Sequence, residues 1–170
     1  TRDHGNARLK IGLGDGSRLS LVLNALNQAD TQDPLGLTRA QVAANPRQAD
    51  PATTLFNTRK SIGQTQVGTT WGRRLANGDS LRLSLYGGAR DVTQFLSFGG
   101  GAITSSGGVV ALERSYSGFG ARWARNAELA GKPLALSAGV DAEGMRERRR
   151  GYVNNSGVQG ALRRDEDDEV

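Results

Sequence analysis

The stretch that most limits how this chain can fold is "GDSLRLSLYGG", residues 78–88, in which leucine recurs at every second position. Leu81, Leu83 and Leu85 alternate with polar side chains, and successive side chains of a β-strand point to opposite faces. The stretch therefore predicts a strand with one apolar and one polar face. The apolar face needs an apolar neighbour, which is a second core layer in a soluble sheet protein and lipid in a membrane barrel.

The same alternation recurs in pairs of segments joined by short turns. Asp15-Gly16 and Asn77-Gly78 are dipeptides typical of hairpin turns, and "NAELAGKP" provides a third turn. We therefore predict an all-β fold, an antiparallel up-and-down meander whose strands follow the order of the sequence. The predicted strands span residues 7–14, 17–27, 59–74, 79–91, 114–126 and 133–148.

The connections between these hairpins are long, polar and glycine-rich, at residues 27–59, 90–115 and 146–156. Compact soluble domains rarely hold such loops, whereas short turns at one end and long loops at the other are typical of bacterial outer-membrane barrels. We therefore predict a sector of a transmembrane β-barrel with long extracellular loops. Within the first loop, a Thr-x-x-Gln capping box at Thr38 predicts a short helix at residues 39–45.

The two tryptophans fit the same layout. Trp71 and Trp123 each lie on the apolar face of a strand, a few residues before a short turn. In an outer-membrane barrel they would form part of an aromatic girdle at the periplasmic interface. The alternative is two unrelated tryptophans of a soluble core.

Composition excludes several classes of protein. The 170 residues include no cysteine and one histidine, His4, so disulfides, thiolate sites and histidine-based triads are excluded. No run of 18 apolar residues predicts a transmembrane helix. The basic run "RERRR" is interrupted by Glu147 and lacks an aromatic platform, so we predict the base of an extracellular loop and no nucleic-acid partner. We predict no enzyme activity, no catalytic residues and no metal ligands.

Three segments resemble the barrel portion of TonB-dependent outer-membrane receptors for ferric siderophores. They are "DPLGLTRAQVAANPRQAD" at residues 33–50, "FNTRKSIGQTQVG" at residues 56–68 and "RRGYVNNSGVQGALRRDEDD" at residues 149–168. The resemblance implies a barrel of about 22 strands in the outer membrane of a Gram-negative bacterium, plugged by an N-terminal domain. It also implies import of a ferric siderophore with energy from TonB. Iron would enter already chelated, so no cofactor is expected.

The chain departs from that family in having no plug, no TonB-contacting segment and too few strands to close such a barrel. Residues 1–170 are therefore predicted to be a partial receptor barrel, with about six strands and the start of a seventh. The expected partners are the ferric siderophore, outer-membrane lipid and lipopolysaccharide. In the full-length receptor, TonB and the plug domain join them.

An anionic ferric chelate favours recognition by arginine, whose planar fork suits carboxylates. Arg59 and Arg90 are the strongest candidates, because each lies where a long loop meets a strand. The full set of candidate ligand-binding residues is Arg39, Arg47, Arg59, Lys60, Arg90 and Arg114. The alternative is that these rim residues meet lipopolysaccharide phosphates, while arginines of the barrel interior pair with plug carboxylates.

Two other functions remain open at this point. A complete small outer-membrane barrel of about eight strands would have a structural or adhesive role. A soluble basic β-domain would bind polyanions, consistent with the formal net charge of +5. The number of strands and the closure of the sheet distinguish a complete small barrel from a receptor sector. Protein covering the leucine faces would indicate the soluble domain.

Overall fold

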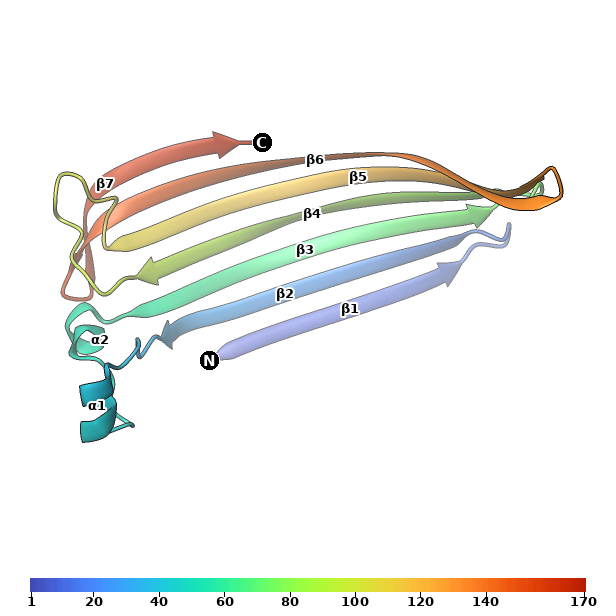
Figure 1. Cartoon of the computed structure of the whole chain (residues 1–170). Coiled ribbons are helices and arrows are strands. Elements are labelled where there is room, and N and C mark those ends of the chain that lie inside the picture. Colours follow the sequence, from blue (N-terminus) through green and yellow to red (C-terminus); the bar gives the residue numbers. More distant parts are fainter.

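The computed structural model describes residues 1–170 as one curved layer, an antiparallel sheet in which each strand pairs with its neighbour in sequence (Figure 1). The strands are β1 Arg2–Gly12, β2 Arg18–Gln32, β3 Arg59–Arg74, β4 Ser80–Phe95, β5 Val109–Leu129, β6 Lys132–Asn155 and β7 Val158–Glu169. Two helices, α1 Arg39–Ala44 and α2 Pro51–Phe56, lie between β2 and β3. The predicted all-β up-and-down meander is confirmed.

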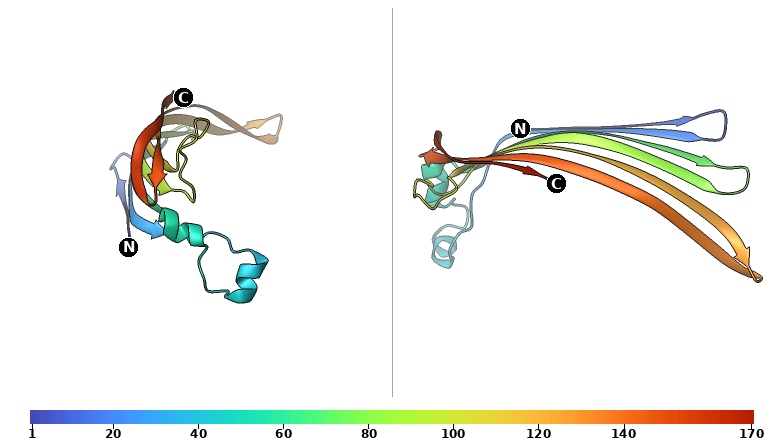
Figure 2. Two further views of the ribbon diagram at one scale, coloured as in Figure 1. Left: turned by 90° about the vertical axis from the view of Figure 1, so that its left-hand side faces the viewer. Right: turned by 90° about the horizontal axis from the view of Figure 1, so that it is seen from above.

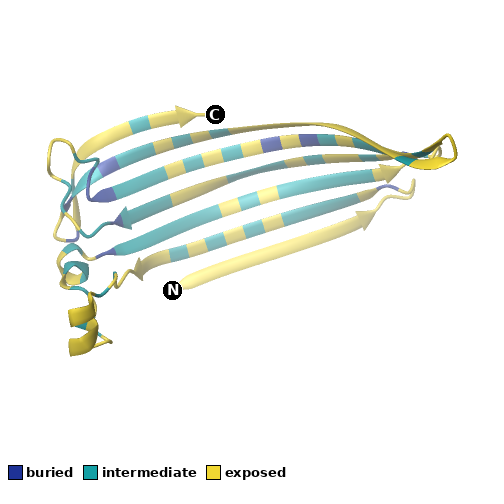
Figure 3. Ribbon diagram, in the orientation of Figure 1, coloured by how far each residue is buried: buried dark blue, intermediate teal, exposed yellow.

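The sheet has no second layer against it. Phe95 and Val109 are the only buried hydrophobic side chains, and both lie at the end of the sheet that carries the loops. Figure 3 shows the strands as intermediate or exposed over most of their length. The outer edges of β1 and β7 are unpaired, so the sheet is open. The leucine faces are therefore not covered by protein within this chain.

The first two short turns share one construction. Gly16 and Gly78 adopt φ angles of 80° and 86°, in the left-handed region that favours glycine. In each turn the preceding side chain, Asp15 or Asn77, accepts the backbone N–H two residues further along the chain. The Ser17 hydroxyl and N–H lower the pKa of Asp15 by hydrogen bonding to its carboxylate. The local sequence thus fixes both hairpins.

The predicted loop at residues 146–156 is wrong. β6 continues to Asn155, a tight turn follows at Ser156-Gly157, and β7 is a full strand of 12 residues. Residues 146–150, predicted as a loop base, lie inside β6. All five are charged, so they show no apolar alternation. Ion pairs between β6 and β7 accompany their pairing in the sheet. β4 and β5 also extend further toward the loops than predicted.

The long connection between β2 and β3 contains the predicted helix α1 and an unpredicted second one. The Thr38 side chain accepts the Gln41 N–H, and the Gln41 side chain accepts the Thr38 N–H, so the predicted capping box is present. In α2, Asp50 caps the helix and Pro51 follows at its first position. Hydrogen bonds from the Ala52 N–H and from the Gln41 side chain lower the pKa of Asp50. Neither helix has the length and apolarity needed to cross a membrane.

The register sorts side chains onto two faces, since paired residues of adjacent strands point the same way. One face collects the alternating apolar residues and is called here the apolar face. One of its rows contains Ile11, Leu19, Trp71, Leu83, Ala121 and Val140, and the next contains Leu9, Leu21, Thr69, Leu85, Phe119 and Ala142. Exposed fractions of 42% for Leu83 and 56% for Leu85 show how open this face is.

The opposite, polar face is concave. It includes Gly151, and the Ser106 carbonyl of the loop at residues 96–108 occupies the space that a Cβ on Gly151 would fill. Figure 2 shows this loop inside the curve of the sheet. The polar face is therefore called the concave face below.

The close approach at Gly151 leads to a prediction. Gly151→Ala is expected to displace the loop at residues 96–108, because the added methyl group meets a backbone carbonyl rather than a flexible side chain. Faster proteolysis within that loop would report the displacement. Gly63→Ala is the matched control, since nothing lies within 4 Å of its added Cβ. Equal cleavage rates in the two variants would contradict the packing described here.

Candidate functional site: two faces and a loop end

The apolar face is divided along its length into two zones. The apolar rows occupy the half nearer the short turns, and the same face becomes charged toward the loops. There, side chains of β6 form ion pairs with both neighbouring strands, with Arg148 Nη2 lying 2.7 Å from Asp165 Oδ2. This ion-pair ladder consists of Arg146, Arg148 and Arg150 of β6 with Glu113 of β5 and Asp165, Asp167 and Glu169 of β7.

The two tryptophans lie near the turn end of the apolar rows. Through the register with β4, Trp123 lies two residues nearer the turns than Trp71. The turns are staggered in the same direction, because the first ends level with Gly72 and the second lies beyond Arg74. The two rings are thus offset by two residues along the strands, in the direction in which the turns are staggered. The Trp123 indole N–H also donates to Asp79 Oδ2 at 2.9 Å, which ties the ring to the second turn.

On the polar, concave face, two glycines leave room for tyrosine rings of the neighbouring strands. The Tyr86 side chain crosses over Gly118 of the next strand and donates to Glu143 Oε2 at 3.0 Å on the strand beyond. The Tyr116 ring lies over Gly88 in the same manner. A Cβ at either glycine would meet the ring, so the two glycines let long polar side chains lie flat along the wall.

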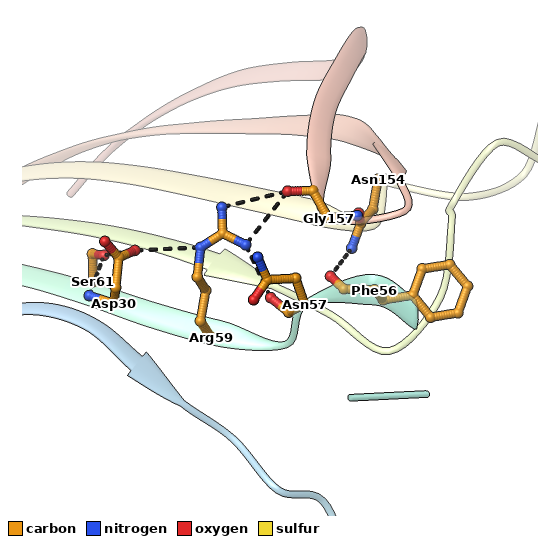
Figure 4. Close-up of polar contacts among 7 residues, drawn as sticks. All are labelled: Asp30, Phe56, Asn57, Arg59, Ser61, Asn154 and Gly157. Atoms are coloured by element: carbon orange, nitrogen blue, oxygen red, sulfur yellow. Dashed lines mark hydrogen bonds and ion pairs between the residues drawn. The ribbon is translucent and has the colours of Figure 1, made fainter. Parts of the chain in front are cut away.

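At the loop end, Arg59 is fully engaged within the chain (Figure 4). Its Nε lies 3.3 Å from Asp30 Oδ1, and its terminal nitrogens donate to the carbonyls of Asn57 and Gly157. The guanidinium carbon lies 3.5 Å from the centre of the Phe95 ring. Only 18% of the side chain is exposed. Arg59 therefore joins the β2–β3 connection to the β6–β7 turn.

Asn154 makes a second junction, which the sequence analysis did not identify. Its Nδ2 donates to the carbonyls of Phe56 at 3.1 Å and Leu96 at 3.0 Å, and its Oδ1 accepts the Gly157 N–H at 2.7 Å. The residue is 2% exposed. One side chain thus links the end of α2, the loop at residues 96–108 and the β6–β7 turn, as Figure 4 shows in part.

The remaining predicted ligand-binding residues fall into two groups. Arg90 and Arg114 are direct cross-strand neighbours on the concave face, and Arg114 Nε donates to Glu147 Oε2 at 2.6 Å, whereas Arg90 has no acidic partner. Lys60 lies on β3 opposite Gln94. Arg39 and Arg47 lie on the exposed helical connection and form no ion pair. The register thus places Lys60, Arg90 and Arg114 on the concave face of three neighbouring strands. Arg59, opposite Phe95, belongs to the other face, and Arg39 and Arg47 lie apart on the helical connection.

No known protein-family model matches the chain. No three histidine, aspartate or glutamate side chains converge as candidate metal ligands. The molecule is therefore described by its fold alone. It is an open, curved β-meander with one uncovered apolar face.

Proposed function

We propose that this chain forms part of the wall of an outer-membrane β-barrel, in a TonB-dependent receptor that imports a ferric siderophore. The observation that carries the proposal is the uncovered apolar face, which backs onto a polar, concave one. That arrangement matches a barrel wall with lipid outside and water inside. The ion-pair ladder fits the same orientation, because its charges belong above the hydrocarbon.

The two alternative functions account for less of the structure. A soluble polyanion-binding domain needs protein over the leucine rows, and this chain supplies none. A small barrel closed by these strands alone would pair β1 with β7, which run in the same direction because every neighbouring pair is antiparallel. Bacterial single-chain barrels close through antiparallel strands. A sector of a larger barrel requires neither a protein layer over the leucine rows nor pairing of β1 with β7.

The receptor class rests on the resemblance of the segments at residues 33–50, 56–68 and 149–168. From it follow the proposed partners, which are the ferric siderophore, lipopolysaccharide, the receptor's plug domain and TonB. Iron arrives pre-chelated in this proposal. The protein then contributes recognition of the chelate rather than iron ligands.

Among the proposed ligand contacts, Arg90 is the best available group. Its neighbour Arg114 is paired with Glu147, while Arg90 retains an unpaired charge on the exposed concave face. Directly opposed like charges repel, and an anion between them relieves that repulsion. Arg59, whose donors are already used, instead orders the loops around the ligand.

Arg90→Ala is expected to weaken binding of an anionic ferric chelate by about 1.5 to 3 kcal/mol, since one charge-assisted contact is lost. Equilibrium binding of ferric citrate to the full-length receptor measures this. Arg122→Ala is the control, because Arg122 lies toward the short turns and has its own partner, Asp141. Unchanged binding in Arg90→Ala, with uptake still dependent on TonB, would reject the residue assignment. A soluble, periplasmic parent protein would reject the barrel itself.

A further inference from the structure

Near the short turns, the concave face holds two arginines that have no acidic partner. Arg18 of β2 and Arg82 of β4 lie in one cross-strand row, with Gly72 of β3 between them. Neither forms an ion pair, and both are exposed. Because Gly72 has no side chain, the two guanidinium groups border an open space instead of a packed one.

That space is a hollow of about 730 Å³. Its side-chain donors are Arg18, Arg73, Arg74 and Arg82 together with the hydroxyls of Ser20, Thr70 and Ser80, and no carboxylate is among the lining residues. Arg73 is already paired, with its Nη1 3.1 Å from Asp15 Oδ2 beside the hollow, whereas Arg18, Arg74 and Arg82 form no ion pair. Arginine forks beside hydroxyl groups are the donors that carboxylate and phosphate oxygens require. The chemistry of the wall here is therefore complementary to an oxyanion.

The charge balance of the hollow differs from that of β5 and β6 toward the loops. There, Arg114, Arg146, Arg148 and Arg150 each form an ion pair with an acid, as in the pair of Arg114 with Glu147. In the row of the hollow, Arg82 lies directly opposite Arg122, so two like charges are held together. Only Arg122 has an acid nearby, with Nη2 3.7 Å from Asp141 Oδ2. Such a row is destabilising unless an anion compensates it.

We propose that the hollow between Arg18 and Arg82 binds a small, multivalent oxyanion that carries carboxylate or phosphate groups. This site goes beyond the proposed function, because it lies at the opposite end of the strands from Arg90 and from the loops. The two guanidinium groups bind separate oxyanion groups of one ligand, and the Ser20 and Thr70 hydroxyls complete the contact from the adjacent row.

The test uses pyrophosphate and citrate as probes, titrated into the purified protein in detergent micelles. Modification of arginine by phenylglyoxal, mapped by mass spectrometry, is expected to be suppressed at Arg18 and Arg82 as either probe saturates. Arg18→Gln and Arg82→Gln should each weaken binding of the probe by about tenfold or more. Arg8→Gln is the matched control, because Arg8 lies on the same face without an acidic partner but outside the hollow.

Loss of affinity confined to the two variants of the hollow supports the site. An equal loss in Arg8→Gln, or protection spread over all exposed arginines, would show only general attraction to a basic wall and would overturn the proposal. Arg18→Lys provides a second check in a variant that keeps the charge and removes the fork, and it should bind more weakly than the parent chain. Retained Arg90-dependent binding of the ferric chelate alongside a failed test would reject the hollow and leave the proposed function intact.

Discussion

Leu83→Arg is expected to destabilise the assembled barrel by about 1 to 3 kcal/mol, because it places a charge on the lipid face between the interface, marked by its cross-strand partner Trp71, and the middle of the membrane. Leu83 lies in the middle of the apolar rows, between Trp71 and Ala121 in its own row. The free energy of unfolding, measured by denaturant titration of the intact barrel in lipid vesicles, gives the cost directly.

The matched control is Ser84→Arg, one residue along the same strand and on the other face. Ser84 borders Gly120, and Asp141 approaches the same empty position from β6. An arginine at position 84 would therefore face water and lie near Asp141, so the loss of unfolding free energy should be much smaller than at position 83. Equal costs at positions 83 and 84 would mean that the two faces are wrongly assigned.

Asn154→Ala is expected to cost about 2 to 4 kcal/mol of stability at the loop end, because several buried polar groups lose their partner at once. The carbonyls of Phe56 and Leu96 and the N–H of Gly157 would be left unsatisfied. Hydrogen exchange should become faster at Gly157 and in the loop at residues 96–108.

Asn155→Ala separates this effect from a general weakening of the turn. Asn155 is exposed, and its side chain forms no hydrogen bond. Its replacement should leave exchange at Gly157 unchanged. If both variants behaved alike, Asn154 would not be the link between the loops.

The half of the sheet near the short turns was predictable from sequence, because there the strand pattern appears as alternating hydrophobicity. β3 matches its prediction at Arg59–Arg74, and the turns at Asp15-Gly16 and Asn77-Gly78 are local features. Toward the loops, charged residues occupy both faces of the strands, as at residues 146–150 of β6, so no apolar alternation marks them. For this reason the predicted strand at residues 133–148 ends before the observed end of β6 at Asn155. For the same reason β7 is predicted only as the start of a seventh strand.

The loop end was less predictable, since its contacts join distant parts of the sequence. Arg59 reaches the carbonyl of Gly157, 98 residues further along, and Asn154 reaches back over the same separation to Phe56. No local pattern reports such contacts. By contrast, α2 had a readable signal in Asp50-Pro51, an N-cap residue followed by proline at the first helical position.

The central claim, that the apolar face meets lipid, is tested most directly by accessibility along β4 in the native outer membrane. Because the chain has no cysteine, single cysteines at positions 81 to 86 can each carry one spin label without other changes. Collision rates with oxygen, which concentrates in lipid, and with a water-soluble nickel chelate should alternate. Labels at positions 81, 83 and 85 are predicted to favour oxygen, and those at 82, 84 and 86 the nickel chelate. Six labels that all favour the nickel chelate, or that show no period of two, would contradict the account.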